Sequence, residues 1–401
     1  MEETDTDLVS NPGHAQIRAG EHLIYEACGD EAGPTLIVFG SIHGNEAAGL
    51  HAVRRVAEKL ERLKPKISGR VFLFAGNTRA IAKAVRFIDS DLNRHWTPEN
   101  VARSMPGSSI PPKLSEDFEQ VEILQHLIGI LGSARNEVYV LDLHSTSAAG
   151  VPFATVGDTL RNRTFALRFP VTILLGIEEK LEGTLLEYLN NRGAVTLGFE
   201  GGQHFAASTI DTHEALIWLG LQNAQIIERS EDIDVEHFRD VLKKSSGRSR
   251  IVEVRYRHAI TENDQFEMRP GFSNFDPIEH GQLLARDHTG EITASESGLM
   301  LMPLYQALGE DGFFIGRQVA GFWLWLSGVL RRIRVGSLIH LLPAVRRVGN
   351  DPNVLEVDTV IARFFPLQIF HLLGFRKLRW HADKLIVARR NFDTSSPFSE
   401  R

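Results

Sequence analysis

Three residues in the first half of the chain have the types and the spacing of a catalytic metal site. His43 and Glu46 form a His-x-x-Glu motif, and His144 comes much later, after an Asp-Leu pair. Two imidazoles and one carboxylate fill three of the four positions around a zinc ion and leave the fourth open for water, as in catalytic zinc sites. Taken one at a time, the three would be a loop histidine, a helix-start glutamate and a strand-end histidine. Together they predict a hydrolytic zinc site.

A fourth segment supplies a base for that chemistry. Glu200 lies in the glycine-flanked sequence Gly-Phe-Glu-Gly-Gly, where a carboxylate can approach a metal-activated water closely. Zinc lowers the pKa of such a water, and a nearby carboxylate can take the proton and later pass it to the leaving amine. We therefore expect Glu200 to be the general base and acid, although in isolation it would be an exposed turn glutamate.

The segment Arg-Phe-Ile-Asp-Ser-Asp-Leu-Asn-Arg, from Arg86 to Arg94, carries groups that can hold a substrate. One guanidinium can polarise the scissile carbonyl, and another can bind a substrate carboxylate through two parallel hydrogen bonds. Asn93 can add a donor to the same carboxylate. Asp89 and Asp91 leave a structural alternative open, in which the arginines form ion pairs within a turn.

The elements that must position these residues follow an α/β pattern. Between Pro34 and Glu228, short apolar runs alternate with amphipathic stretches, which predicts a sheet with helices on both faces. Strands are expected at Leu36–Phe39, Arg70–Phe74, Val138–Leu143, Val151–Val156, Val171–Leu175 and Ala194–Phe199. His43, His144 and Glu200 each lie at the end of one of these runs. Because ligands bind outside the carboxyl ends of strands in open α/β sheets, we expect the three side chains at one edge.

The chain changes character in its second half. A charged, small-residue run around 245–250 predicts a linker, and short runs separated by turn residues, beginning with Ile251–Tyr256, predict a small β domain. Apolar and arginine-rich segments then continue to the end. The predicted domains are a catalytic domain at 15–244, a β-rich domain at 250–316 and an extension at 317–401, apolar and basic, packed on the rest.

Taken together, these segments resemble the succinylglutamate desuccinylase/aspartoacylase family of zinc carboxypeptidase-like hydrolases. The matching motifs are Gly40–Glu46, Asn77, Arg86–Arg94, Asp142–His144 and Glu200, with Pro270–Pro277 and Leu301–Gln306 similar to that family's carboxy-terminal β domain. The resemblance implies a three-layer α/β/α fold with a mixed, mostly parallel sheet, followed by the β domain and an apolar helical extension. It also implies that the β domain narrows the active-site entrance and excludes long peptides.

The resemblance assigns the metal ligands and the base. It implies one Zn²⁺ per subunit, bound by His43, Glu46 and His144, with Glu200 as general base and acid. The implied reaction is hydrolysis of an N-acyl amino acid by metal-activated water. His and carboxylate ligands accept several divalent ions, so the native metal is an expectation that rests on the family.

The resemblance also assigns the groups that contact the substrate. It places Arg86 on the scissile carbonyl, and Asn93 and Arg94 on the substrate carboxylate. Tyr305 is the candidate counterpart of a tyrosine that helps to define the substrate in aspartoacylase-like proteins. The expected partner is therefore a small N-acyl amino acid.

Composition excludes other classes of protein. The 401 residues suffice for roughly two or three domains with substantial cores. The single cysteine, Cys28, rules out an intramolecular disulfide and a thiolate metal site. A net charge of −7 disfavours a nucleic-acid partner. The acidic start, Met1–Asp7, lacks the basic and apolar regions of a secretory signal, so we expect a cytoplasmic protein.

The most apolar stretch is Val319–Leu330, which three nearby arginines follow. It is too short to cross a bilayer, which requires about 20 residues. An interfacial helix with a basic flank would suit tryptophan and arginine at a membrane surface. Because apolar runs of this length usually lie in a core, we expect a buried helix or a homo-oligomer interface rather than peripheral membrane contact.

Three functions remain to be compared. The leading hypothesis is a zinc-dependent amidohydrolase, or deacylase, that acts on a small, carboxylate-bearing N-acyl amino acid. A zinc carboxypeptidase-like peptidase is the alternative among hydrolases, and the predicted β domain disfavours it. An inactive, membrane-peripheral binding protein is the alternative of another class. The complete set of ligands and base argues against that alternative, because a scaffold has no need of them.

Overall fold

The structure is a computed structural model that describes residues 17–30, 32–228, 232–306, 309–342, 345–349, 351, 353–358, 367–381 and 384–398. The acidic start, on which the expected cytoplasmic location rests, lies outside these residues. Among the helices described, none is both long and apolar enough to cross a membrane.

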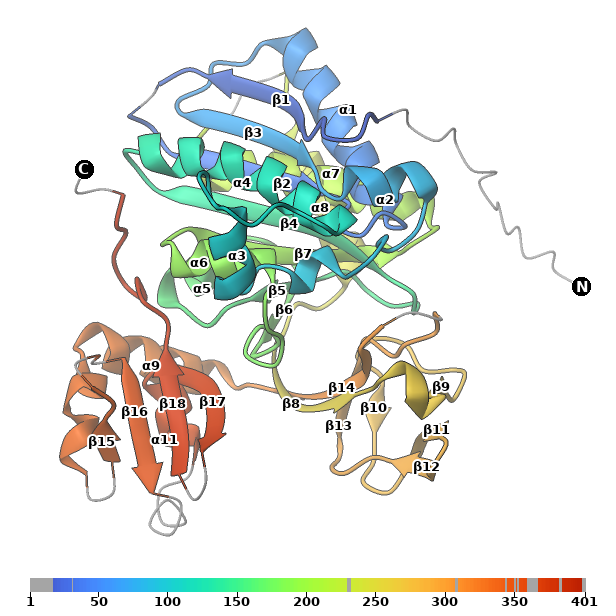
Figure 1. Ribbon diagram of the computed structural model, residues 1–401, viewed down its shortest axis with the longest axis vertical. Coiled ribbons are helices and arrows are strands. Elements are labelled where there is room, and N and C mark those ends of the chain that lie inside the picture. Colours follow the sequence, from blue (N-terminus) through green and yellow to red (C-terminus); the bar gives the residue numbers. More distant parts are fainter. Residues whose placement is uncertain are drawn as a thin grey trace, which may run out of the picture.

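A single large sheet forms the centre of the molecule (Figure 1). Its strands are Leu23–Cys28 (β1), Thr35–Gly40 (β2), Arg70–Ala75 (β3), Val138–Thr146 (β4), Phe153–Val156 (β5), Thr172–Leu175 (β6), Val195–Gln203 (β7), Ile251–Ala259 (β8), Pro277–Ile278 (β10), Gly298–Leu301 (β13) and Asp311–Gln318 (β14). Within the described chain, the order of these eleven strands is β1-β3-β2-β4-β7-β5-β6-β8-β14-β13-β10. Neighbours from β3 to β7 are parallel, and β5 reverses direction against β7. All six expected strands are present.

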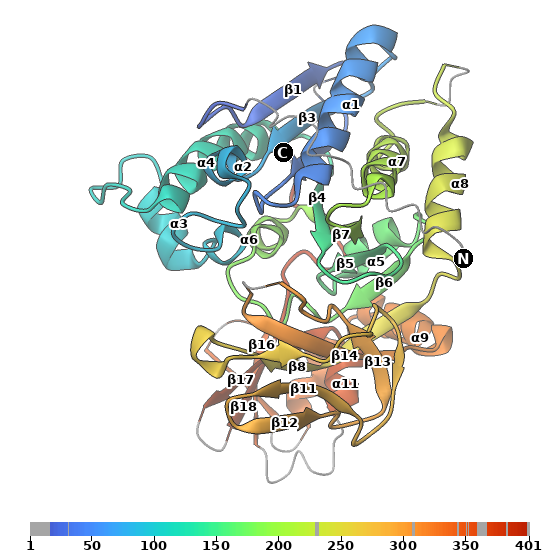
Figure 2. The same ribbon diagram turned by 90° about the vertical axis from the view of Figure 1, so that its right-hand side faces the viewer.

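Helices cover both faces of this sheet. They span Ala47–Leu63 (α1), Thr78–Lys83 (α2), Pro98–Ser104 (α3), Ser115–Ser133 (α4), Leu160–Ala166 (α5), Leu185–Asn191 (α6), Ala207–Asn223 (α7) and Val235–Ser246 (α8), with a 3₁₀ turn at Leu92–Arg94 (η1). Figure 2 shows α1, α7 and α8 on one side of the sheet and α3, α4 and α6 on the other. The expected mixed α/β fold with helices on both faces is confirmed.

The sequence of strand β2 explains its position between two helical layers. All four of its apolar residues are fully buried. Because successive side chains of a strand point to opposite faces, Leu36 and Val38 pack with residues of α1 and α7, whereas Ile37 and Phe39 pack with residues of α4. An uninterrupted apolar run is therefore what a doubly covered strand requires.

The second half of the chain continues the central sheet. Ile251–Tyr256 was expected in a separate β domain, but it belongs to β8, which pairs in parallel with β6 and so extends the large sheet. A strand's local pattern does not specify its partner, which explains the difference. A three-stranded antiparallel sheet follows, made of Glu267–Met268 (β9), Leu283–Asp287 (β11) and Gly290–Thr293 (β12), with a 3₁₀ turn at Glu262–Asp264 (η2). The three domain ranges stay a prediction.

The extension combines helices with a small antiparallel sheet. It contains Gly321–Arg332 (α9), Val335–Leu341 (η3, a 3₁₀ helix), Val345–Arg347 (β15), Val354–Asp358 (β16), Leu367–Leu372 (α11), Phe375–His381 (β17) and Lys384–Arg389 (β18). The sheet, ordered β15-β16-β18-β17, was not expected from the sequence. The chain then returns to the catalytic part, where Phe398 is buried in the core beside Val138 and Leu189.

Candidate metal centre and active site

The turn after β2 presents His43 and Glu46 at the carboxyl edge of the sheet. Ser41 adopts a positive φ of 63°, and its hydroxyl donates to the carbonyl oxygen of Glu46 at 2.7 Å. Gly44 passes so close to Ala80 that a Cβ would lie 2.3 Å from the Ala80 carbonyl carbon, so only glycine fits. Helix α1 begins directly after Glu46, and the tight turn therefore directs both side chains to one point.

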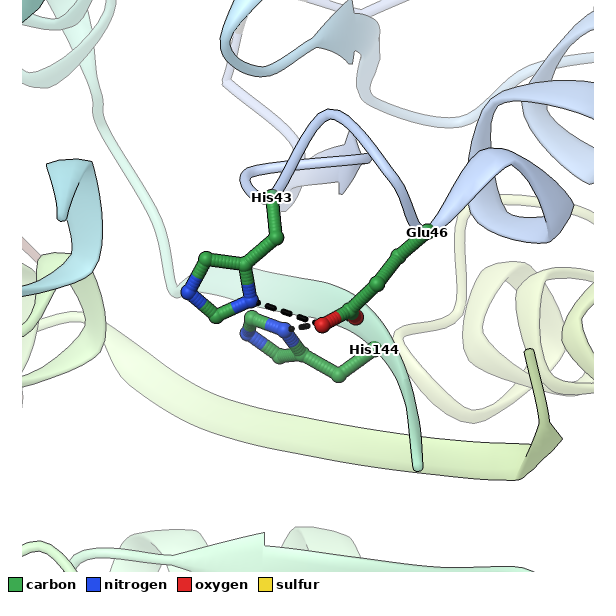
Figure 3. Close-up of side chains that lie close together, drawn as sticks. All are labelled: His43, Glu46 and His144. Atoms are coloured by element: carbon green, nitrogen blue, oxygen red, sulfur yellow. Dashed lines mark hydrogen bonds and ion pairs between the residues drawn. The ribbon is translucent and has the colours of Figure 1, made fainter. Parts of the chain in front are cut away.

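Figure 3 shows that His43, Glu46 and His144 converge. The Nδ1 atom of His43 lies 2.8 Å from Oε1 of Glu46, and the Nδ1 atom of His144 lies 3.3 Å from Oε2 of the same carboxylate. His144 stands near the end of β4, which runs parallel to β2 and so ends at the same edge. The tertiary structure thus brings the three expected ligands together.

The far nitrogen of each imidazole is held by a carboxylate. Nε2 of His43 lies 3.1 Å from Oδ1 of Asp91, and Nε2 of His144 lies 2.9 Å from Oδ2 of Asp142. Metal-binding histidines usually have such a partner, which orients the ring and leaves the other nitrogen free for the ion. In both rings that other nitrogen is the Nδ1 that faces Glu46.

These donors fit a zinc ion. With bonds of about 2.0–2.1 Å in a tetrahedral site, neighbouring donor atoms are about 3.3 Å apart. The 3.3 Å from Nδ1 of His144 to Oε2 of Glu46 equals that value, whereas the 2.8 Å from Nδ1 of His43 to Oε1 is a hydrogen-bond distance that must lengthen when an ion binds. Two nitrogens and one carboxylate also match the ligand types of catalytic zinc. The binding of the ion itself stays a prediction.

The charges of the three expected ligands shift one another's pKa values. Burial by itself would raise the pKa of Glu46, but His43 and His144 outweigh it and hold that pKa well below its usual value. For His144 burial acts in the opposite direction, and the carboxylates of Asp142 and Glu46 raise its pKa well above 6.5. In the absence of a metal, a proton on His144 therefore balances the acidic groups around it.

Glu200 faces the same edge from β7. It is the register partner of His144 in the pairing of β4 with β7. Its Oε2 atom is buried and has no hydrogen-bond partner among the described residues. Burial raises the pKa of Glu200 to about 8, and the charge of Glu46 adds to the rise. A carboxylate that is desolvated and unpartnered, and whose pKa lies near neutrality, is suited to accept and return a proton.

Arg86 lies between the ligands and Asp91. Its Nη2 atom donates to Oδ2 of Asp91 at 3.0 Å and lies 2.9 Å from Nε2 of His43, while Nη1 lies 3.6 Å from Oε1 of Glu46. The turn ion pair considered for the sequence is therefore present. It does not exclude a role on substrate, because Arg86 also lines the cleft and its Nε is buried without a hydrogen-bond partner in the described chain.

The loop that carries Arg86 is held by a residue that sequence reasoning missed. Buried Glu116, in the first turn of α4, accepts hydrogen bonds from the backbone N–H groups of Ile88, Asp89 and Ser90. It also accepts one from Nδ2 of Asn77. The only local signal was a glutamate at a helix start, which is common and does not indicate such a contact.

Asn93 and Arg94 both line the cleft, but each already has partners. Nδ2 of Asn93 lies 3.4 Å from Nε2 of His144, and its Oδ1 accepts from the backbone N–H of Leu185 at 3.0 Å. Arg94 pairs with Asp311 of β14 at 3.2 Å and lies 3.5 Å from Glu310. A substrate carboxylate must therefore share Arg94 with these two acids.

The cleft that contains the site has a volume of about 160 Å³. Its far wall includes Met302, Pro303, Leu304 and Gln306, from the segment between β13 and β14. Tyr305 lies in the same segment, yet it is not among the described residues that line the cleft. Its hydroxyl instead accepts from the N–H of Phe272, which turns the ring away. Among the described contacts, Tyr305 reaches the cleft lining through its backbone N–H, which donates to the hydroxyl of Ser147 at 3.2 Å, and not through its ring.

Two histidines complete the surroundings of His144. His204 lines the cleft, and its Nδ1 lies 2.7 Å from the hydroxyl of Ser145. His213 of α7 is buried, and its Nε2 lies 2.8 Å from the carbonyl oxygen of His144. Burial lowers the pKa of His213 to about 4, so the ring is neutral and donates to that carbonyl. Neither is part of the group formed by His43, Glu46 and His144.

A second cluster of side chains that commonly bind metals is unsuited to a cation, because its carboxylates are already paired with an arginine. His22, Glu119 and Glu122 have donor atoms within 4.8 Å of one another. However, Arg79 pairs with Glu119 at 2.6 Å and with Glu122 at 2.8 Å, and Thr78 donates to Glu119. The guanidinium already supplies the positive charge that a metal would bring.

Part of the chain matches a known protein family. Residues 32–182 match the model of the succinylglutamate desuccinylase/aspartoacylase catalytic domain. This part of the chain is similar to that catalytic domain. The matched range contains His43, Glu46, Arg86 and His144 but ends before Glu200.

Individual relatives are distant. An aspartoacylase of Xenopus tropicalis is 31% identical over 112 residues, which is 28% of this chain and 34% of the relative. The succinylglutamate desuccinylase of Pseudomonas aeruginosa is 26% identical over 275 residues, which is 64% of this chain and 75% of the relative. The chain thus spans about a third of the length of the first curated relatives that it matches.

Solved structures show the same fold. The X-ray structure of succinylglutamate desuccinylase from Vibrio parahaemolyticus has a TM-score of 0.53 at 17% identity, covering 76% of this chain and 90% of that chain. At this identity the likeness concerns the fold alone. It agrees with the central mixed sheet and its two helical layers.

Proposed function

We propose that the protein is a zinc-dependent hydrolase that cleaves the amide bond of a small N-acyl amino acid or a related carboxylate-bearing amide. One observation carries the proposal. A ligand set of catalytic type shares one cleft with Glu200, whose Oε2 atom is buried and has no hydrogen-bond partner in the described chain. The match of residues 32–182 to a deacylase catalytic domain supports it.

The chain's own residues divide the work of hydrolysis. His43, Glu46 and His144 would hold the metal, which when bound polarises a carbonyl and lowers the pKa of water. Glu200 takes a proton from the attacking water and returns it to the amine nitrogen as the C–N bond breaks. Arg86 donates to the oxygen on which negative charge develops.

The other end of the substrate would be held by Asn93 and Arg94. The fork of Arg94 can bind a carboxylate through two parallel hydrogen bonds, in competition with Asp311. The wall formed by Met302 to Gln306 restricts the cleft, which favours small amides over the long peptides of a carboxypeptidase-like enzyme.

The test is a hydrolysis screen with zinc-reconstituted full-length protein. Acetyl, succinyl and longer acyl derivatives of amino acids are assayed beside short peptides, with metal-free protein as the control. We expect release of a free amino acid from N-acyl amino acids only when zinc is present. Cleavage of peptides alone would favour the peptidase, and zinc-loaded protein without activity on either class would overturn the proposal.

A further inference from the structure

Helix α9 buries two polar residues and exposes its three aromatic ones. Its buried side chains are those of Ser327 and Arg331, next to Gly328. The exposed fractions of its aromatic side chains are 60% for Phe322, 51% for Trp323 and 63% for Trp325. A surface helix of a globular protein normally shows the reverse, with an apolar stripe toward the core. The expectation of a buried helix is therefore wrong for this face of α9.

The orientation of α9 is fixed by its polar side. Arg331 is bound by Asp158 of the catalytic part at 3.1 Å and by Asp393 at 3.0 Å. The hydroxyl of Ser327 donates to the carbonyl oxygen of Leu372 at 2.8 Å. Because these buried bonds hold the helix, its aromatic side is directed outward. Figure 2 shows α9 at the outer edge of the molecule.

Further large apolar side chains are exposed just after the helix. Ile333, Leu338 and Leu341, at the end of α9 and in η3, are 66%, 58% and 71% exposed. We call these three side chains, together with Phe322, Trp323 and Trp325, the α9–η3 surface. Within it, the ring centroid of Phe322 lies 5.3 Å from that of Trp323 and 6.0 Å from that of Trp325. Scattered exposed apolar residues need no explanation, but a cluster of large ones marks an interaction site.

Exposed arginines occur in the segment that carries the α9–η3 surface. Residues 317–350 contain six arginines and neither Asp nor Glu, and all six except the buried and paired Arg331 are exposed. The whole extension, 317–401, has 14 Lys and Arg against 6 Asp and Glu, a net charge of +8 in a chain whose total is −7. Arg317, Arg332 and Arg334 are exposed beside the aromatic residues.

We propose that the α9–η3 surface binds the surface of an anionic phospholipid membrane. Tryptophan and phenylalanine insert at the level of the lipid headgroups, and arginines on the flank bind lipid phosphates. Each arginine near an anionic leaflet strengthens binding about fivefold. A second copy of the chain suits this surface less well, because a symmetric dimer would place two strongly positive extensions against each other.

The test is flotation of the full-length protein with vesicles. Vesicles of phosphatidylcholine alone are compared with vesicles that also contain phosphatidylglycerol, at about 0.1 M and about 1 M salt, where the screening length falls from about 10 to about 3 Å. We expect the protein to float only with the anionic vesicles, and to detach largely at high salt. The emission of the exposed Trp323 and Trp325 should shift to shorter wavelength when they enter the membrane. Trp96 and Trp218 are already buried, so their emission should stay the same.

Two sets of variants separate the apolar from the ionic contribution. F322S/W323S/W325S should abolish flotation and the emission shift, and R332Q/R334Q should weaken binding about 30-fold. The matched controls are L167S, which removes an exposed leucine elsewhere, and R18Q/R286Q, which removes two exposed arginines. Both controls should float like the unaltered chain. Unchanged unfolding temperatures show that the variants are folded.

The contrary results are distinct. If the chain fails to float with anionic vesicles, or if F322S/W323S/W325S floats as well as the controls, the proposal is overturned. If sedimentation shows a dimer that the same triple variant converts to a monomer, the surface is a contact between copies and the proposal is also overturned. Amide hydrolysis is not needed for any of these measurements, so they are independent of the proposed function.

Discussion

The Nε2 atom of His144 lies 2.9 Å from Oδ2 of Asp142, on the opposite side of the ring from the Nδ1 that faces Glu46. This contact fixes the tautomer that leaves Nδ1 free for a metal. We predict that D142N weakens zinc binding about 10- to 100-fold, which is the usual effect of losing such a partner. Competition with a chromophoric chelator measures the affinity. An unchanged affinity would show that Asp142 does not orient the ligand.

Glu200 is predicted to transfer a proton during hydrolysis and not to bind the metal. E200Q keeps the size of the side chain but removes its basicity, so kcat should fall by at least about 10²-fold. Zinc content should stay at one ion per chain, because Glu200 lies outside the ligand set. Metal analysis together with kcat on the best substrate of the screen checks both statements. Retained turnover would remove Glu200 from the mechanism.

Proton release on metal binding follows from the pKa values in the site. Below pH 8, Glu200 is largely protonated in the metal-free chain, because burial raises its pKa to about 8. A nearby cation favours the carboxylate, and His144 must lose its proton to bind. We therefore expect zinc binding at pH 7 to release protons, and E200Q to release fewer.

Calorimetry in buffers of different ionisation enthalpy counts the released protons. The difference between the two proteins should shrink as the pH rises above about 8, where Glu200 has already lost its proton. If E200Q released as many protons as the unaltered chain at pH 7, the raised pKa of Glu200 would be wrong.

The pairing of Arg94 with Asp311 predicts opposite effects of two substitutions. R94A removes a charge-assisted hydrogen bond worth about 1.5–3 kcal/mol, so KM for a carboxylate-bearing substrate should rise about 10- to 100-fold. D311N frees the guanidinium of Arg94 and should lower KM. Initial rates with a substrate and its carboxamide analogue provide the check. The carboxamide should be insensitive to both changes if Arg94 binds the carboxylate.

Asp158 is predicted to hold the extension on the catalytic part. It is fully buried and pairs with Arg163, Arg331 and Arg376, two of which belong to the extension. Burial by itself would raise its pKa, but the three guanidinium groups outweigh that effect and hold it well below 3.8. D158N should lower the free energy of unfolding by about 3–5 kcal/mol, because it removes the buried negative charge that three guanidinium groups share.

The pH dependence of that effect has a definite sign. A carboxyl whose pKa is lowered by folding stabilises the protein above its unfolded pKa, and the contribution is lost as the pH falls through the folded value. The gap between D158N and the unaltered chain in urea unfolding should therefore be full at pH 7 and should shrink only below about pH 4. D240N, at an exposed aspartate, is the control and should show no gap.

The side chains whose meeting was predicted from the sequence share one property. Each follows or ends an apolar run that can be recognised from neighbouring residues alone. The apolar run of β2 and the His-x-x-Glu that follows it are neighbours in the chain. The same holds for β4 with His144 and for β7 with Glu200. Since parallel neighbouring strands end at one edge, local patterns were enough to predict that these side chains meet.

Contacts between distant segments had no such signal. Glu116 accepts hydrogen bonds from the loop before Asp91, and Arg94 pairs with Asp311. Both contacts join elements that the sequence does not mark as neighbours. The same is true of Tyr305, whose hydroxyl is used by a nearby loop instead of the cleft.

The sequence by itself determined the strands and the placement of His43, His144 and Glu200 at their ends, because hydrophobic periodicity and the residues that follow each strand are features of adjacent positions in the chain. Only the tertiary structure decided which side chains already have a partner within the protein, as Arg94 and Tyr305 do, and which face of α9 is exposed. Arg331 is one arginine among several in the sequence. Its burial against Asp158 turns the helix so that Trp325 is directed outward, and that choice depends on residues far apart in the chain.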